Sequence, residues 1–191
     1  MKIYIKNMVC IRCKMAVKAA LESLNIDFKS LELGEVETVR EVSHEQLRQL
    51  DACLKKSDLE LIESRKNILV EKIKTAIIEL VHYSDEQIKV NLSDFLSQKL
   101  NYDYTYLSNL FSEVQGISIE KFFITHKIER VKELLVYNEY NIKEISFMTR
   151  YSSVAHLSNQ FKKVTGIPPS QFKNLQHKTR HTLEQVSSYY C

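Results

Sequence analysis

The stretch LSNLF at residues 107–111 returns as LSNQF at residues 157–161. Each copy continues through a valine to a Gly-Ile pair and then to a phenylalanine, so that Gly116 and Gly166 stand at the same point. Every matching residue lies 50 positions further along the chain. A repeat without slippage indicates that one supersecondary unit is used twice. Because apolar residues recur in each copy at helical spacing and glycine commonly ends a helix, each copy predicts a helix followed by a turn.

The first unit reads as a helix, a turn and a second helix. Residues 92–100 form a short apolar-periodic segment, and the second helix is expected from about 104 to 114. Asp103, in the turn, suits the start of the second helix because its carboxylate can accept hydrogen bonds from backbone N–H groups there. The inward face of the second helix is expected to carry Leu107, Leu110, Phe111 and Val114.

The second unit follows the same plan, with a short helix over 142–148 and a second helix from about 154 to 164. Ser152 or Ser153 is the expected cap. A long amphipathic helix, from about 119 to 137, lies between the two units and is expected to join them. The inward face of the last helix is expected to carry Leu157, Phe161 and Val164.

The outward face of each second helix is left with small polar or methyl-bearing side chains. A helix-turn-helix inserts such a face into the major groove of DNA, where Asn pairs with adenine, Ser serves several bases and methyl groups touch thymine. The simpler alternative is a solvated surface on a helix bundle, but two matching copies favour contact with double-stranded DNA. The candidate base-contacting residues are Thr105, Ser108, Asn109, Ala155, Ser158 and Asn159.

Basic side chains near these helices are candidates for holding DNA phosphates, which orients a protein without reading sequence. The net charge of +3 is divided unevenly, with −1 over residues 1–63 and +4 over residues 64–191. The positive excess therefore lies in the half that carries the repeat, although +4 is also ordinary for a surface of this length. The candidates for phosphate contact are Lys162 and Lys163, with Lys127, Arg130 and Lys173.

Residues 1–63 alternate between strand and helix patterns, in the order βαββαβ. This order predicts an α+β, ferredoxin-like domain with four antiparallel strands and two helices on one face of the sheet. Ser43 and Gln46 form a capping box at the start of the second helix. The predicted elements are a strand at 2–6, a helix over 10–24, two strands within 27–42 around Gly34, a helix from Ser43 and a strand at 59–62.

From Ser64 the pattern becomes helical and stays so. We expect a connecting helix within 64–91, an all-α domain of two helix-turn-helix units over 92–175, and a polar tail over 176–191. Only three glycines and two prolines in 191 residues agree with a helix-rich chain that has few sharp turns.

No apolar run approaches the roughly 20 residues that cross a bilayer. The first residues lack the apolar core of a signal peptide. We therefore expect a cytoplasmic protein with reduced cysteines. The chain has no Gly-rich phosphate loop, no G-x-S-x-G and no H-E-x-x-H, so no enzyme is expected.

Cys10 and Cys13 form a C-x-x-C pair where the first strand meets the first helix. The amides at a helix start, its dipole and Arg12 favour thiolates there. Two thiolates suit a soft ion such as Cu(I), whereas Zn²⁺ needs four ligands and no second pair stands near in sequence. The alternatives are idle thiols in a module kept for sensing or dimerisation, and a thiol redox role, which the surrounding pattern disfavours.

The segments LSNLFSEVQGIS at 107–118, KIERVKELL at 127–135 and FKKVTGIPPSQF at 161–172 carry a family resemblance. With them, residues from about 90 to 175 resemble the DNA-binding domain of the AraC/XylS transcription regulators. The resemblance implies two helix-turn-helix units on one long helix, entering successive major grooves on one face of the duplex. It also implies base contacts at the six candidate residues. The chain departs from the family at 148–151, where a small residue and then Gly-Phe are usual.

The segment NMVCIRC at 7–13 carries a second resemblance. With the βαββαβ order, residues 1–62 resemble the heavy-metal-associated domain of copper chaperones and copper ATPases. This resemblance implies that Cys10 and Cys13 ligate a copper ion. Val9 departs from the polar residue that is usual at its position.

The sequence as a whole predicts a sequence-specific DNA-binding transcription regulator whose N-terminal module senses a signal, with Cu(I) as the candidate. One alternative is a Cu(I) carrier that uses its C-terminal half for interaction with a partner. Another is a regulator whose N-terminal domain serves only dimerisation, so that the chain forms a homodimer.

Overall fold

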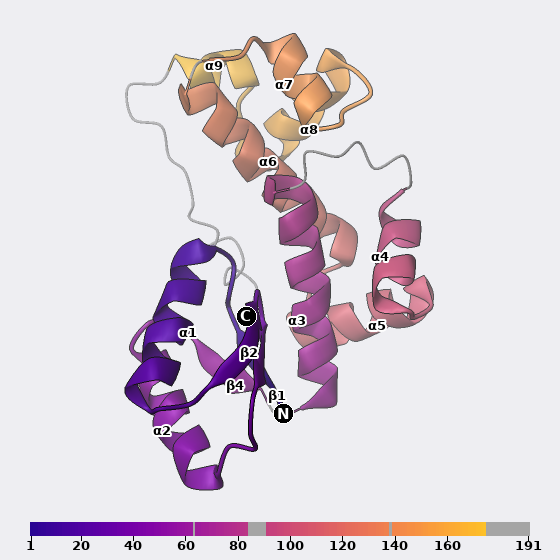
Figure 1. The fold of residues 1–191 in the computed structure, drawn as a ribbon. Helices are drawn as coiled ribbons and strands as arrows, with labels where there is room; N and C mark the ends of the chain where they lie inside the picture. Colours follow the sequence, from indigo (N-terminus) through magenta and orange to yellow (C-terminus); the bar gives the residue numbers. More distant parts are fainter. Residues whose placement is uncertain (63, 84–90, 138, 175–191) are drawn as a thin grey trace.

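The computed structural model describes residues 1–62, 64–83, 91–137 and 139–174 (Figure 1). The N-terminal part is a four-stranded antiparallel sheet in the order β2-β3-β1-β4. Helices α1 and α2 cover one face of this sheet (Figure 1), which confirms the predicted α+β arrangement. The elements are β1 (Lys2–Lys6), α1 (Ile11–Ser23), β2 (Phe28–Glu32), β3 (Glu35–Thr38), α2 (His44–Lys55) and β4 (Glu60–Ile62).

Local chemistry fixes the elements of the sheet domain. Ile3 and Ile5 of β1 alternate into the core, as a half-buried strand requires. Gly34 joins β2 to β3 with a φ of +80°, a conformation that glycine adopts without strain. The predicted capping box is present, since Ser43 accepts from the Gln46 amide and the Gln46 side chain accepts from the Ser43 amide. The strand, the turn and the helix start in this domain are therefore each determined by residues that can be recognised in the sequence.

Helix α3 (Arg65–Ile78) continues as a π-helical turn, η1 (Glu79–Tyr83), on the opposite side of the sheet from α1 and α2 (Figure 1). The expected connecting helix is thus present up to Tyr83, and residues 84–90 lie outside the described ones. It is more than a connector, because its apolar side chains form one core with the first helix-turn-helix unit. Ile78, near its end, belongs instead to the buried cluster of the sheet domain. One helix therefore contributes to both cores.

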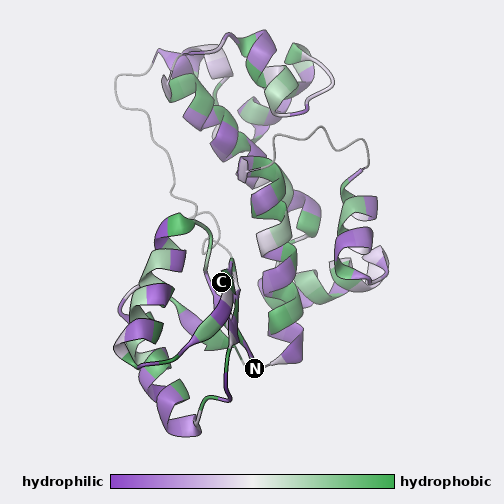
Figure 2. Cartoon of the chain, viewed as in Figure 1, coloured by the Kyte–Doolittle hydropathy of each residue, from purple (hydrophilic) through white to green (hydrophobic). Residues whose placement is uncertain are grey.

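The remaining helices form the all-α part that the sequence predicts. Figure 2 shows hydrophilic and hydrophobic residues alternating along these helices, as expected of amphipathic helices. The long helix α6 joins the two units (Figure 1). The elements are α4 (Leu92–Leu100), α5 (Tyr104–Gln115), α6 (Ile119–Tyr137), α7 (Ile142–Met148), α8 (Val154–Thr165) and α9 (Pro169–Lys173).

The sequence repeat is also a repeat of packing. Phe111 of α5 meets Phe122 of α6 edge to face, with ring centroids 5.5 Å apart and planes at 65°. Phe161 of α8 meets Phe172 of α9 at 5.5 Å and 70°. Each pair lies in its own buried cluster. The two units therefore have separate cores built around the same aromatic contact.

One prediction about these cores is wrong. Val114 and Val164 were expected to pack inward, but they are 36% and 43% exposed. Both lie in the last turn of their helix, just before its glycine C-cap. Periodicity gives the side of a helix that faces the core, but it does not give how far along the helix its neighbours reach.

The described part of the chain contains no helix that is both long and apolar enough to cross a membrane.

Candidate nucleic-acid interface

Helix α5 is fixed at both ends. The Asp103 carboxylate accepts hydrogen bonds from the backbone amides of Thr105 and Tyr106, at 2.8 and 3.3 Å, as the sequence predicts. At the other end, Gly116 has a φ of +69° and its amide donates to the Ser112 carbonyl. These contacts satisfy amide and carbonyl groups that a helix terminus leaves unpaired. The outward face of α5 is therefore held in one orientation.

Helix α8 has the same terminal arrangement. Of the two candidate caps, Ser153 is the one used, since its hydroxyl accepts from the His156 amide at 3.0 Å. Gly166 ends the helix with a φ of +83°. In the preceding turn, Arg150 takes a φ of +57°, which glycine adopts more easily than other residues. At 148–151, where the AraC/XylS pattern usually has glycine before an aromatic residue, this chain has Arg150. The turn still contains a residue in the left-handed conformation.

The predicted DNA-contacting residues all lie at the surface of α5 and α8. Ser108 and Ser158 are half-buried. The others are exposed, and each member of α5 has its counterpart on α8 in the same burial class. Their contact with DNA stays a prediction. The exposed residues are Thr105, Asn109, Ala155, Asn159, Lys162 and Lys163.

Two of the additional basic candidates are engaged within the protein. Lys127 has its Nζ atom 3.8 Å from the centre of the Tyr151 ring and donates to the Arg150 carbonyl at 3.3 Å. Burial, with a smaller effect of the Arg150 charge, lowers the pKa of Lys127 to about 8. Arg130 pairs with Glu133 at 2.7 Å. Lys127 is therefore half-buried and engaged with the α7–α8 turn, and its contact with phosphate stays a prediction.

Two exposed rings beside the candidate readers were missed by the sequence analysis. Tyr106 of α5 stacks on Tyr102, with ring centroids 5.6 Å apart and planes at 26°. His156 of α8 meets Tyr151 edge to face at 5.2 Å. Tyr106 and His156 are separated by the 50 residues of the repeat, so the sequence did contain the signal that pairs them.

The cysteine pair lies at the start of α1, with the two Sγ atoms 3.5 Å apart. Cys10 is the half-buried N-cap residue, and Cys13 is buried. Burial raises the pKa of the Cys13 thiol, so the expected stabilisation of a thiolate by the helix start is outweighed at this residue. Among the described residues, no three His, Cys, Asp or Glu side chains come together as metal ligands. Two adjacent sulfur donors suit a two-coordinate soft ion and do not suit tetrahedral Zn²⁺.

The cysteine loop is attached to the helical part by hydrogen bonds. The Tyr83 hydroxyl donates to the Val9 carbonyl at 3.0 Å. The Asn7 amide donates to the Glu71 carboxylate at 3.4 Å. Glu71 also pairs with the buried Lys74 at 2.8 Å. A change in the loop would therefore act on α3 and η1 directly.

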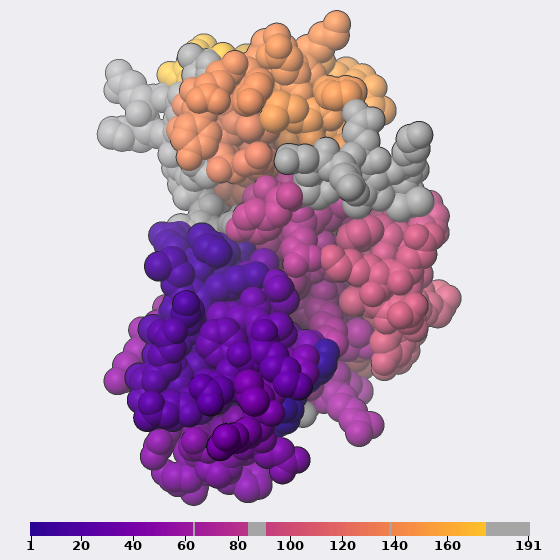
Figure 3. Space-filling model, viewed as in Figure 1, coloured from indigo at the N-terminus to yellow at the C-terminus, as the bar shows by residue number. Residues whose placement is uncertain are grey.

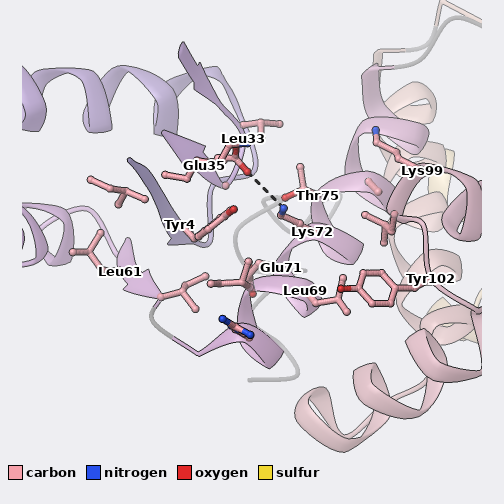
Figure 4. A pocket seen from close by; sticks show the side chains of 18 of the residues that line it. Tyr4, Leu33, Glu35, Leu61, Leu69, Glu71, Lys72, Thr75, Lys99 and Tyr102 are labelled. Atoms are coloured by element: carbon pink, nitrogen blue, oxygen red, sulfur yellow. Dashed lines mark hydrogen bonds and ion pairs between the residues drawn. The ribbon is translucent and has the colours of Figure 1, made fainter. Parts of the chain in front are cut away.

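A groove of about 930 Å³ separates the open face of the sheet from α3 and α4 (Figure 4). Lys72 of α3 spans it, with its Nζ atom 3.6 Å from Glu35 and 4.9 Å from the centre of the Tyr4 ring. Figure 3 shows the sheet domain lying against α3 on the face in view. The two parts are thus joined by polar contacts along the groove and by apolar packing at Ile78.

Comparison with known proteins assigns the C-terminal part. Residues 96–175 match the helix-turn-helix domain family. An uncharacterized HTH-type transcriptional regulator, YtdP from Bacillus subtilis, is 25% identical over 112 residues, which are 59% of this chain and 14% of that protein. An uncharacterized HTH-type transcriptional regulator from Staphylococcus aureus is 31% identical over 96 residues, which are 50% of this chain and 12% of that protein. The chain therefore matches only a small part of each relative.

A solved structure gives the same assignment. The C-terminal domain of AraT, a response regulator from Geobacillus stearothermophilus, is 26% identical, with a TM-score of 0.50 over 62% of this chain and 97% of that one. The predicted helix-turn-helix part is thus confirmed over residues 96–175. The heavy-metal-associated resemblance of residues 1–62 stays a prediction.

Proposed function

We propose that this chain is a sequence-specific DNA-binding transcription regulator that uses α5 and α8 as its two reading helices. The observation that carries the proposal is the equivalence of their outward faces. Each face lies between a side-chain N-cap and a glycine C-cap, and each carries Ser and Asn at matching positions. The helix-turn-helix match over residues 96–175 and the names of the relatives support this reading.

In the proposed complex, each reading helix enters one major groove. Asn109 and Asn159 pair with adenine edges, and Ser108 and Ser158 accept several bases. Helix α6, with 19 residues, is roughly 28 Å long at the rise of an α-helix. This length is close to one turn of B-DNA, so the target is a bipartite site with half-sites about 10 base pairs apart. The exposed Lys162 and Lys163, in the last turn of α8, hold phosphates.

The test is a selection from random duplexes at fixed salt, followed by affinity measurements. Asn109→Ala and Asn159→Ala should each weaken the best site by about 1–3 kcal/mol and relax the preference at one base position. Gln49→Ala, an exposed change on α2 in the sheet domain, is the matched control and should leave both quantities unchanged. If neither asparagine variant alters sequence preference, these residues are not readers.

We further propose that the N-terminal part binds Cu(I) through Cys10 and Cys13 and thereby regulates DNA binding. The 3.5 Å separation of the two Sγ atoms favours this proposal. Near-linear ligation of one ion by both thiolates would require the two sulfurs to move apart, and the hydrogen bond between Val9 and Tyr83 would carry this change of the loop to η1 and α3. Coupling of this kind needs an element that both sites act upon, and α3 contributes to both cores.

This second proposal is tested by Cu(I) titration under reducing conditions, with DNA affinity measured at each step. Cys10→Ser and Cys13→Ser should abolish binding of the ion, whereas Cys53→Ser, at a half-buried thiol on α2, should not. Cu(I) binding with no duplex preference would favour a carrier. If the cysteine variants lost a dimer that the wild-type chain forms, and DNA affinity did not respond to Cu(I), the N-terminal part would serve dimerisation only.

A further inference from the structure

Tyr106 and His156 occupy the same place on the two reading helices. Each follows one candidate base-contacting residue, Thr105 or Ala155, and precedes an asparagine by three positions. Both side chains are exposed, and Tyr106 is 47% exposed although it is a large aromatic residue. Neither ring lies inside a core, whose central aromatic pairs are formed by phenylalanines, although His156 covers the buried Tyr151 from outside.

Each ring is supported from the turn that precedes its helix. Tyr102 stacks on Tyr106 at 5.6 Å, and Tyr151 meets His156 edge to face at 5.2 Å. The Ser152 hydroxyl lies 3.0 Å from Nδ1 of His156. When this hydroxyl donates to Nδ1, the ring proton is on Nε2. These contacts limit the rotamers of the two rings, so less conformational entropy is lost if they bind a partner.

The position of the rings selects the kind of contact. Successive residues of an α-helix are 100° apart, so Tyr106 lies about 60° around the helix from Asn109. A residue on this flank faces the wall of a major groove when the centre of the face is directed at the bases. The wall is the sugar-phosphate backbone, which accepts hydrogen bonds from Tyr, His and similar donors. The acidic residue on the same flank, Glu113, is paired with Lys66 at 2.8 Å, which reduces its repulsion of phosphate.

We infer that Tyr106 and His156 are equivalent contacts to the DNA backbone, one for each half-site, with the Tyr106 hydroxyl and Nε2–H of His156 as donors to phosphate oxygens. This inference rests on the proposed function and adds two residues to it. Because phosphate contacts carry no sequence information directly, these residues contribute to affinity and not to the choice of base.

The experiment measures Kd for the best duplex and for a scrambled duplex at one salt concentration, with the full chain. Tyr106→Phe removes only the hydroxyl, and His156→Ala removes the ring nitrogens. Each should raise Kd roughly twofold to tenfold on both duplexes, as expected for one lost hydrogen bond. Tyr140→Phe and His44→Ala are exposed controls off the reading helices and should leave Kd unchanged.

Two outcomes overturn the inference. One is a Kd that stays at the value of the controls in both variants. The other is a changed preference at a single base, which would make the ring a base reader. Asn109→Ala and Asn159→Ala, measured in the same assay, distinguish failure of this inference from failure of the proposed function. If they change base preference while the ring variants have no effect, only the inference fails; if the wild-type chain binds no duplex, the proposed function fails with it.

Discussion

The side chain of His126 is buried in α6 with neither ring nitrogen hydrogen-bonded among the described residues. It packs against Phe122 at 4.5 Å and meets His82 edge to face at 5.7 Å. Burial, with smaller effects of His82 and Lys74, lowers the pKa of His126 to about 3. The folded protein therefore holds this ring neutral, whereas the unfolded chain protonates it near the ordinary pKa of histidine.

This difference predicts acid sensitivity. Between pH 6.5 and about 3 the unfolded state binds one more proton, so the contribution of His126 to the free energy of unfolding is complete above pH 6.5 and is lost as the pH falls. The loss is at most about 1.4 kcal/mol per pH unit. Denaturant titrations should show that the free energy of unfolding of wild type falls more steeply with decreasing pH than that of His126→Phe. A difference that is constant from pH 7 to 4 would contradict this account, and His44→Ala is the exposed control.

The ion pair between Lys74 and Glu71 is almost fully buried, with side chains 2% and 10% exposed. Removing one partner of such a pair leaves an uncompensated charge in the core. Glu71→Gln should therefore lower the free energy of unfolding by about 3–5 kcal/mol. Glu113→Gln breaks the exposed pair with Lys66 and should cost less than about 1 kcal/mol. Equal losses in the two variants, measured by denaturant titration, would show that Lys74 is solvated after all.

At the scale of elements, the two glycine C-caps give matched predictions. Gly116 and Gly166 have positive φ angles, and a Cβ atom at either position would meet nothing within 4 Å. Substitution by Ala therefore costs only backbone strain, about 1–2 kcal/mol. Asn tolerates this conformation and should cost less. Thermal unfolding of the Ala and Asn variants tests this, and a larger loss for Asn would show that backbone strain is not the cause.

Helix caps and the order of strands and helices along the chain could be predicted from the sequence because local residues determine them. Asp103 and Ser43 cap helices through amides only two or three positions away. The 50-residue repeat gave the separate units and, through its aromatic residues, the centre of each core. These features depend on residues that are close together in the sequence or on the repeat itself.

Burial of charged residues could not be predicted in the same way. The sequence offers Lys127 as a candidate for phosphate contact, yet it packs against the Tyr151 ring, and Lys74 is only 1% exposed although it is a cation. These placements depend on tertiary contacts of α3 and of the α7–α8 turn, which no local pattern encodes. The matched rings at Tyr106 and His156 were visible in the repeat, but their support by Tyr102 and Tyr151 depends on turn geometry.

For the whole molecule, α3 links the stability of the two parts. Ile78 is 1% exposed in the buried cluster of the sheet domain, while the preceding apolar residues of α3 belong to the helical core. We therefore expect the sheet domain and the first helix-turn-helix unit to unfold together. Ile78→Ala should destabilise the chain by about 2–5 kcal/mol and divide one calorimetric transition into two. Two transitions already present in wild type would contradict this linkage.

The single long helix between the two units also constrains how this chain could change its target. The side chains of the reading faces are exposed or half-buried, so their replacement would leave the cores intact and could alter the recognised bases one at a time. Spacing is different, because one residue inserted into α6 would advance the second unit by only about 1.5 Å but rotate it by about 100°. The two faces would then be directed to different sides of the duplex. Divergent descendants of this chain should therefore vary in the bases they prefer while keeping the angular phase between half-sites.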